Sequence, residues 1–217
     1  MSEPVLYGYW RSSAAYRVRI ALNLKGIEYR QAPVHLVRDG GEQHAERYRE
    51  LNPQGLVPTL VDGETVVTQS IAILEYLEET IPAPALLPTD PGERARVRGL
   101  GLIVACDIHP LQNLRVLNRL RDQHGVGDDA KAEWVRYWIT AGLTAFEAML
   151  ARSPDTGAFC HGEKPGYADA CLVPQIYNAD RWGCDLGRLP TIRRINSACL
   201  ELEAFRAAVP EAQPDAA

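Results

Sequence analysis

Short apolar runs alternate with helically spaced apolar positions over the first 80 residues. The run Val5–Trp10 is rich in aromatic and branched residues and predicts a strand. A helical pattern follows from Ser13 and ends at Gly26, a typical C-terminal cap, and a second strand is expected over Glu28–Leu36. The other elements expected in this part are a helix over Glu42–Leu51, strands over Leu56–Val61 and Thr65–Thr68 joined by Asp62-Gly63, and a helix over Ser70–Glu79. The order is βαβ followed by αββα.

The pattern changes after Ile81, where four prolines fall within the ten residues from Pro82 to Pro91. Such a stretch cannot form a helix and predicts a linker between domains. Helices are expected beyond it over Glu93–Asp122, Asp129–Arg152, Tyr167–Arg181 and Pro190–Leu200. We therefore expect an α/β domain over residues 1–83, a linker over 84–91 and an all-helical domain over 92–217, with the last seven residues as a loosely held tail.

Composition narrows the class of protein. Of 217 residues, 46% are hydrophobic and 24% charged, which favours a folded globular chain, and the net charge of -5 disfavours nucleic-acid binding. No apolar stretch approaches the roughly 18 residues of a membrane span, and Met1–Tyr7 lacks the features of a signal peptide. Five widely spaced cysteines without a C-x-x-C pair predict neither a zinc site nor a disulfide framework. A cytoplasmic protein without a bound metal is expected.

The turn after the first strand carries the first candidate chemistry. A helix that begins at Ser13 directs unpaired N–H groups and the positive end of its dipole toward Ser12, which favours an anion there. Either serine can equally be an ordinary N-cap, so this observation leaves both interpretations open.

Two further turns carry similar signals. Pro58 enters just before a strand that should be central, so Val57–Pro58 is either an ordinary strand start or a cis peptide that presents the Val57 backbone to an extended ligand. Gln69-Ser70 opens the next helix, where Ser70 either caps the helix or binds a carboxylate together with the helix N-terminus.

The order of these elements and the residues on them resemble the glutathione transferases, and within them the zeta class of maleylacetoacetate and maleylpyruvate isomerases. The most specific match is Arg11-Ser-Ser-Ala-Ala-Tyr-Arg-Val-Arg-Ile-Ala-Leu22, which is similar to the zeta signature S-S-C-x-W-R-V-R-I-A-L. Supporting matches are Asp39-Gly-Gly41, Asn52-Pro53, Val57-Pro-Thr-Leu60, Gln69-Ser70, Leu86-Leu-Pro88, Asp107-Ile-His-Pro-Leu-Gln-Asn113, and Ala168-Asp169 with Leu172-Val-Pro-Gln175. The resemblance covers nearly the whole chain. It implies a thioredoxin-like N-terminal domain, an all-α C-terminal domain and a homodimer.

The resemblance also implies roles for individual residues. Ser12, or its neighbour Ser13, would hydrogen-bond the glutathione sulfur, and Val57 would pair with the cysteinyl backbone of glutathione through a cis bond to Pro58. Gln69 and Ser70 would hold the γ-glutamyl end. Further positions that match glutathione contacts are Gln43, His109 and Asn113. His109 can instead be a structural residue that kinks its helix beside Pro110.

Two departures from the family pattern stand out. Ala14 occupies the place of the signature cysteine, so a thiol there contributes nothing in this chain. Gly166 stands where the fold usually has a Ser/Thr-x-x-Asp capping box before Asp169, at a cost of a few tenths of a kcal/mol.

The implied chemistry is a glutathione-dependent cis–trans isomerisation of a maleyl diketo acid. Reversible thiolate addition makes the conjugated double bond single for an instant, so glutathione acts as a cofactor. A dianionic substrate needs cations to bind its carboxylates. Arg181 is the first candidate for this role and Arg11 the second. Each can instead be an ordinary solvated surface arginine. Arg17 and Arg115 are interpreted as structural or peripheral.

Maleylacetoacetate in the breakdown of tyrosine and phenylalanine is the first candidate substrate, and maleylpyruvate in gentisate breakdown is the second. One alternative is a broad glutathione transferase that conjugates or dehalogenates small electrophiles. Another is a non-catalytic adaptor with the same fold. Retention of Ser12, Val57-Pro58 and Gln69-Ser70 together argues against the adaptor.

Overall fold

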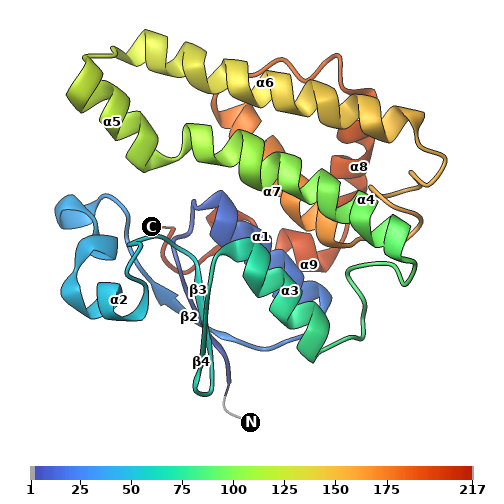
Figure 1. Cartoon of the computed structure of the whole chain (residues 1–217), viewed down its shortest axis with the longest axis horizontal. Helices are drawn as coiled ribbons and strands as arrows, with labels where there is room; N and C mark the ends of the chain where they lie inside the picture. Colours follow the sequence, from blue (N-terminus) through green and yellow to red (C-terminus); the bar gives the residue numbers. More distant parts are fainter. Residues whose placement is uncertain (1–2, 217) are drawn as a thin grey trace. The chain divides into compact units, whose positions relative to one another are not determined.

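The chain divides into two compact units. The structure, a computed structural model, describes residues 3–216. The first unit consists of Met1–Leu86 together with Leu200–Ala217, and the second of Leu87–Cys199. Figure 1 shows the elements of each unit in sequence colours.

A four-stranded mixed sheet forms the centre of the first unit. Its strands are β1 (Val5–Gly8), β2 (Arg30–Pro33), β3 (Thr59–Asp62) and β4 (Thr65–Thr68), in the order β2-β1-β3-β4. β1 runs parallel to β2 and antiparallel to β3, and β3 and β4 form the hairpin that Asp62-Gly63 predicts. With α1 (Ser13–Leu24), α2 (Glu46–Leu51) and α3 (Ser70–Thr80), this confirms the βαβ-αββα order. α2 lies on one side of the sheet, and α1 and α3 on the other (Figure 1).

The second helix of this unit is shorter than predicted. Residues before Glu46 form two 3₁₀ turns, η1 (Arg38–Gly40) and η2 (Glu42–His44), instead of a continuous helix from Glu42. Asp39 at φ 52° and Gly41 at φ 104° break the helical path. The φ of Gly41 lies in a region that residues with a side chain rarely adopt, so this position favours glycine.

A buried ion pair ties the end of α3 to the residues that follow it. Lys25 donates through Nζ to Glu78 at 2.9 Å and to the carbonyl oxygens of Ile81 and Pro84 at 2.6 and 2.9 Å. Glu78 also accepts the backbone N–H of Leu86 at 2.9 Å. These bonds satisfy both charges, which would otherwise be costly to bury.

The C-terminal segment, residues 200–217, clusters with the first unit and does not belong to the helical domain expected over 92–217. Its last seven residues are the ones expected as a loose tail. It contains α9 (Glu203–Arg206) and the 3₁₀ turn η5 (Pro210–Ala212). Gln213 is 5% exposed; its amide nitrogen donates to the carbonyl oxygens of Ala207 and Val209, and its oxygen accepts from Gln31 at 2.8 Å. The prediction of a loosely held end was therefore wrong, because these residues bury a polar side chain and satisfy it.

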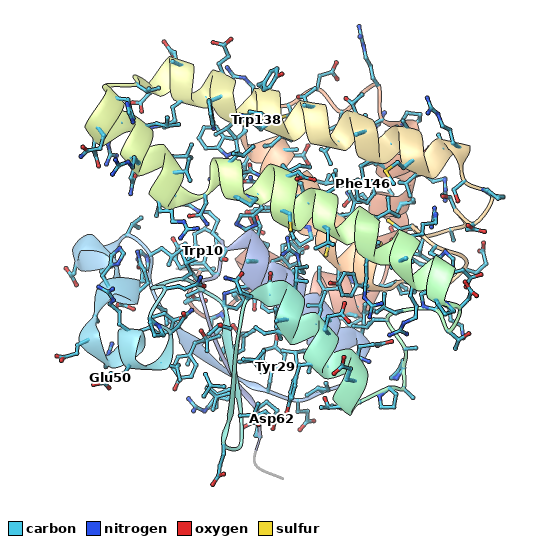
Figure 2. All side chains as sticks on the ribbon, in the orientation of Figure 1. Trp10, Tyr29, Glu50, Asp62, Trp138 and Phe146 are labelled. Carbon is cyan, nitrogen blue, oxygen red and sulfur yellow. The ribbon has the colours of Figure 1, made fainter. Side chains whose placement is uncertain are left out.

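Helices make up the second unit. They are α4 (Pro91–Leu102), α5 (Leu114–His124), α6 (Asp128–Arg152), α7 (Tyr167–Arg181) and α8 (Pro190–Leu200). α4 begins one residue inside the predicted linker, because Asp90 caps it through the N–H groups of Gly92 and Glu93, and Pro91 suits a first helical position. Phe146 of α6 is fully buried in the core of this unit (Figure 2).

The single helix predicted over Glu93–Asp122 is wrong. After α4 the chain forms a π-helical turn, η3 (Ile103–Ile108), and a 3₁₀ turn, η4 (His109–Gln112), before α5. Pro110 cannot donate a backbone hydrogen bond, and Ile108 packs against Gly142 of α6, where any Cβ would lie 2.3 Å from its side chain. The widened turn and the proline together explain the interruption.

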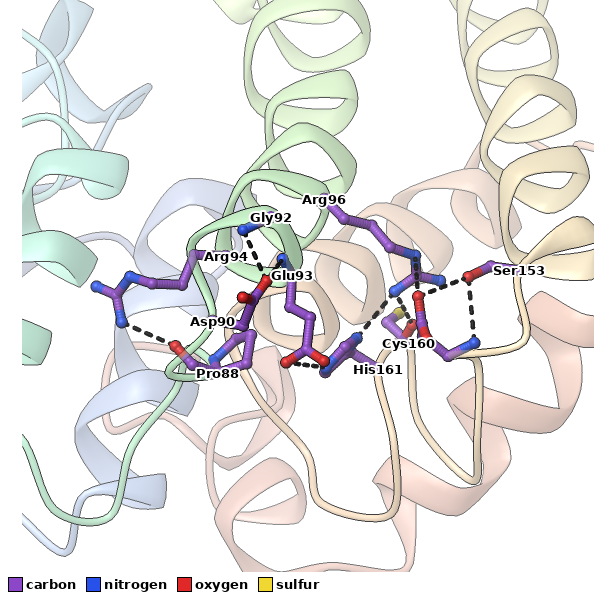
Figure 3. A network of polar contacts seen from close by, with 10 residues as sticks. Pro88, Asp90, Gly92, Glu93, Arg94, Arg96, Ser153, Cys160 and His161 are labelled. Carbon is purple, nitrogen blue, oxygen red and sulfur yellow. Dashed lines mark hydrogen bonds and ion pairs between the residues drawn. The ribbon is translucent and has the colours of Figure 1, made fainter.

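Polar contacts fasten the loop after α6 to the start of α4 (Figure 3). Arg96 donates to the carbonyl oxygen of Cys160 at 3.0 Å and to Thr156 at 2.8 Å.

The buried Asp169 accepts the N–H groups of Cys160 and of Gly166, both at 2.9 Å, so the acidic half of the capping box forms without a hydroxyl at Gly166. Burial raises the pKa of Asp169, and these N–H groups oppose the rise.

Candidate functional site

Four chain segments with candidate residues leave the sheet at the same edge. Tyr7 of β1 pairs with Thr59, so the end of β1 and the start of β3 adjoin. Thr59 also pairs with Thr68, the last residue of β4, and Gly8 pairs with Pro33, the last residue of β2. The register therefore brings the turns that carry Ser12, Gln43, Val57-Pro58 and Gln69-Ser70 to one edge.

Ser12 is the N-cap of α1. Its Oγ accepts the N–H of Ala15 at 3.2 Å, its own N–H donates to Tyr9 O at 2.9 Å, and its side chain is half-buried. The hydroxyl keeps its proton free to donate while the oxygen caps the helix, so the capping and the anion-binding interpretations are compatible. Ser13 is the first residue of the helix, where N–H groups lack intrahelical acceptors.

Arg11 lies in the same turn. Its guanidinium carbon is 5.4 Å from the centre of the Trp10 ring, which is a cation–π contact. Arg11 therefore stacks on its neighbour, and its half-buried side chain adds positive charge beside Ser12.

The Val57–Pro58 peptide bond is cis, as the family resemblance implies. Val57 precedes the β3 ladder, which begins at Thr59. Tyr48 bonds the residues on both sides of this peptide: its hydroxyl donates to Leu56 O at 2.6 Å and lies 3.0 Å from Thr59 Oγ1. Burial raises the pKa of Tyr48, so this hydroxyl remains a donor at neutral pH.

Gln43 of η2 is buried. Its amide nitrogen donates to Leu36 O at 3.3 Å, and its Oε1 has no hydrogen-bond partner among the described residues. A buried amide oxygen without a donor is costly and is available to accept from a ligand.

The start of α3 combines a strained residue with a buried cation. Gln69 is the N-cap at φ 69°, a conformation that non-glycine residues rarely adopt outside functional turns. Ser70 accepts through Oγ from Nη1 of Arg17 at 2.7 Å. Arg17 is 1% exposed, and its Nε and Nη2 atoms have no partner within residues 3–216. The sequence pattern predicts a structural or peripheral role for Arg17. It does not predict that the buried guanidinium of Arg17 lies at the N-terminus of α3.

Three candidate residues lie in the second unit. His109 opens η4, and Asn113 is the N-cap of α5, accepting the N–H of Arg115 at 3.1 Å. Arg181 is the exposed last residue of α7.

A buried amide network connects Arg181 to the η4 turn. Arg181 donates to Asn178 Oδ1 at 3.0 Å, and Asn178 donates to Gln112 Oε1 at 2.5 Å. Gln112 in turn donates to Gln175 Oε1 at 2.8 Å. Sequence reasoning did not single out Asn178 or Gln112 as functional, because their spacing of 66 residues leaves no local signal.

Neither a metal centre nor a membrane span is found in the part of the chain that the structure describes. No group of three or more His, Cys, Asp or Glu residues within 3–216 is placed to hold a metal ion. No helix in this range is both long and apolar enough to cross a bilayer.

Comparison with known proteins identifies the family. Residues 11–80 match the model of the glutathione S-transferase N-terminal domain. The chain is 50% identical over 216 residues to a probable maleylacetoacetate isomerase of Vibrio cholerae, with 100% of both chains covered.

Solved structures agree with this match. One is a holo maleylpyruvate isomerase, described as a bacterial zeta-class glutathione S-transferase, with 49% identity, a TM-score of 0.95, and coverage of 98% of this chain and 100% of the other. Another is a maleylacetoacetate isomerase of Methylobacterium extorquens AM1 with bound malonate and glutathione, with 43% identity, a TM-score of 0.94, and coverage of 98% and 99%. The chain therefore belongs to the maleylacetoacetate and maleylpyruvate isomerase family of zeta-class glutathione S-transferases.

Proposed function

We propose that this protein is a glutathione-dependent cis–trans isomerase of a maleyl diketo acid. Maleylacetoacetate is the favoured candidate substrate, and maleylpyruvate is the alternative. The observation that carries the proposal is the convergence at one sheet edge of the Ser12 N-cap, the cis Val57–Pro58 peptide and the Ser70–Arg17 pair. Relatives with both names share about half of their sequence with this chain, at 50% identity each for the Vibrio cholerae and Ralstonia sp. proteins.

The chemistry of this edge fits glutathione. Glutathione carries a thiol, two peptide groups and two carboxylates, and it therefore needs a hydroxyl donor, backbone pairing and cations. Ser12 supplies the hydroxyl donor, and the backbone of Val57 supplies the backbone pairing. Within the described residues, two buried N–H-bearing nitrogens of Arg17 beside Ser70 have no partner, and neither has the buried amide oxygen of Gln43. These orphaned polar atoms are what a polar ligand would satisfy.

Each residue then has a definite task. The Ser12 hydroxyl donates to the glutathione sulfur, and the N-terminus of α1 stabilises the thiolate, lowering the pKa of the thiol. Ser70, Gln69 and Arg17 hold the γ-glutamyl carboxylate at the start of α3. His109 and Asn113 supply further glutathione contacts.

When bound, glutathione would supply a thiolate for reversible addition to the conjugated double bond; the C–S bond that forms would be the bond that breaks, so no oxidant would be needed. The residues of the chain must hold the substrate through this cycle. Arg181, oriented by Asn178, binds a substrate carboxylate, and Arg11 adds a second positive charge near Ser12. Local arginines are required because the net charge of -5 repels a dianion.

We also infer a homodimer located in the cytoplasm. The dimer is supported by the family to which the chain belongs. The location is supported by the five cysteines, all of which are free thiols, as in proteins from reducing compartments.

The test is a side-by-side assay of both diketo acids with native protein, Ser12→Ala and Ser12→Thr. Turnover should require glutathione, regenerate it unchanged, and fall at least about a hundredfold in Ser12→Ala, with the hydroxyl-retaining variant keeping more activity. Ser197→Ala, at an exposed serine of α8, is the matched control. A parallel Ser13→Ala variant tests which serine serves the sulfur.

Other outcomes of this assay point to other functions. Consumption of glutathione into an adduct would instead indicate a conjugating or dehalogenating transferase. Absence of glutathione binding would indicate an adaptor.

A further inference from the structure

Both backbone polar groups of Trp10 are hydrogen-bonded to side chains, one of them from the C-terminal segment. Its N–H donates to Oδ2 of Asp215 at 3.0 Å, and its carbonyl oxygen accepts from Nη2 of Arg19 at 2.9 Å. Trp10 is two residues before Ser12 and lies at the start of the turn into α1, where Figure 2 labels it.

Arg19 also anchors the C-terminal segment. Its Nε donates to the carbonyl oxygen of Ala208 at 3.0 Å, and Asn23, one helical turn further along α1, donates to Ala204 O at 2.9 Å. Arg19 is 1% exposed. Burial lowers its pKa to about 10, with Tyr29, Tyr16 and Asp215 acting in the opposite direction, so it remains a cation at neutral pH. The C-terminal segment is thus fixed to the same helix that Ser12 caps.

The end of the segment is equally well fixed. Gln213 is buried and bonded to Gln31 of β2, and the N–H of Ala216 donates to Gln213 O at 3.0 Å. Asp215 therefore lies in a turn that the Ala216–Gln213 bond closes and that Gln213 anchors to Gln31.

The Trp10 bonds reach Ser12 through a tight turn. Ser12 N–H donates to Tyr9 O at 2.9 Å, so Trp10 and Arg11 are the central residues of the Tyr9–Ser12 turn. A change in the direction of the Trp10 peptide alters the position of Ser12 relative to the sheet edge. Near-attack geometry tolerates little displacement of such a group.

We propose that Asp215 is a positioning residue for Ser12: its carboxylate oxygen accepts the Trp10 N–H and so fixes the turn that directs the Ser12 hydroxyl at the glutathione sulfur. This inference rests on the proposed function. Arg19 directs its bonds at the Trp10 and Ala208 carbonyl oxygens, and the direct contact of Asp215 with the turn is the hydrogen bond that it accepts from the Trp10 N–H.

The experiment compares Asp215→Ala, Asp215→Asn and native protein. Alanine removes the acceptor, whereas asparagine retains one oxygen and loses the charge. Glu203→Ala is the matched control, because it removes an exposed carboxylate from the same C-terminal segment that, among residues 3–216, pairs with Arg206 of its own helix. A chain shortened after Pro214 is a second way to remove the acceptor.

Two readouts separate positioning from general stability. Hydrogen exchange in a peptide covering the Tyr9–Ser12 turn measures the hold on Trp10 without any ligand. The ultraviolet absorbance of bound glutathione thiolate, followed against pH, measures the consequence for the sulfur. Thermal unfolding is recorded alongside.

We expect faster exchange at the Trp10 amide in Asp215→Ala and in the shortened chain, and a thiolate titration displaced to higher pH. In both, kcat/KM should fall about tenfold, the equivalent of one pKa unit, with the KM for the diketo acid unchanged. Asp215→Asn should stay within about twofold of native protein, since it keeps the acceptor.

Equal losses in Asp215→Ala and Asp215→Asn would overturn the inference in favour of a purely ionic role. So would native-like exchange and titration in Asp215→Ala. If native protein forms no thiolate from bound glutathione, the proposed function fails, and the exchange experiment shows separately whether Asp215 holds the turn.

Discussion

The guanidinium of Arg17 places Nη1 2.7 Å from the hydroxyl oxygen of Ser70, and the two side chains are only 1% and 7% exposed. The other two nitrogens of this guanidinium lack partners within the described residues. A buried cation with one satisfied donor is stable only where its surroundings are rigid or where an anion completes its hydrogen bonds. The pair therefore links the folding of the first unit to the ligand expected at the start of α3.

Replacing Ser70 should affect stability and binding together. Ser70→Ala removes the acceptor of Arg17, and we expect the free energy of unfolding to fall by about 1–3 kcal/mol in urea titrations. Glutathione should bind more weakly by calorimetry. The dipeptide Cys-Gly, which lacks the γ-glutamyl residue, should bind the variant and the native protein equally; an equal loss for both ligands would contradict a role at the γ-glutamyl end.

Asn178 should matter for the substrate and not for glutathione. Asn178→Ala removes the acceptor that orients Arg181 and leaves Gln112 Oε1 without its 2.5 Å donor. We expect the KM for the diketo acid to rise roughly fivefold, about 1 kcal/mol, with the glutathione Kd unchanged. Gln123→Ala, which removes an exposed amide from α5, is the control. A rise confined to the glutathione Kd would refute this assignment.

The Lys25–Glu78 pair should be strongly coupled. Lys25→Met leaves Glu78 charged and buried, and we expect a loss of about 3–5 kcal/mol in the free energy of unfolding. The double variant Lys25→Met/Glu78→Leu should recover part of this loss, because no isolated charge remains. A double-mutant cycle from chemical denaturation measures the coupling. Additive losses would show that the two charges act independently.

The pH dependence of stability should contain a contribution from Asp169. Burial raises its pKa above the ordinary value of 3.8 in the folded protein, so between these two values the folded state holds more protons than the unfolded state. This contribution to stability is complete below pH 3.8 and is lost as the pH rises through the raised pKa. Asp169→Asn lacks the titration but also lacks one acceptor oxygen. We expect its deficit in unfolding free energy relative to native protein to shrink as the pH rises through this window, measured by urea unfolding; a constant deficit would contradict the raised pKa.

Much of the first unit could be predicted because its signals are local. Asp62-Gly63 predicts its hairpin, Ser12 its cap and Gly26 the helix end, each from neighbouring residues. Pro58 shows the boundary of such reasoning: the residue marks a turn, but the local pattern fits an ordinary strand start as well as the cis bond that the structure has.

What the sequence could not predict depends on distant contacts. The Trp10–Asp215 and Gln31–Gln213 bonds join residues 205 and 182 positions apart, so two prolines near the C-terminus suggested a loose end where the structure has an anchored one. The helical periodicity around Ile108 likewise continues through η3 and η4. The pattern of apolar positions carries no information about Gly142, whose missing side chain leaves room for that of Ile108.

The assignment of residues 200–217 to the first unit has a consequence for biosynthesis. The first unit is discontinuous in sequence, so the whole of the second unit is synthesised before the residues that complete the first one. Domains usually fold in the order of their synthesis, N-terminal first. In this chain the unit that begins the sequence is completed last, and a truncated product lacking the final residues would keep Ser12 but lose the Asp215 carboxylate that accepts the Trp10 N–H.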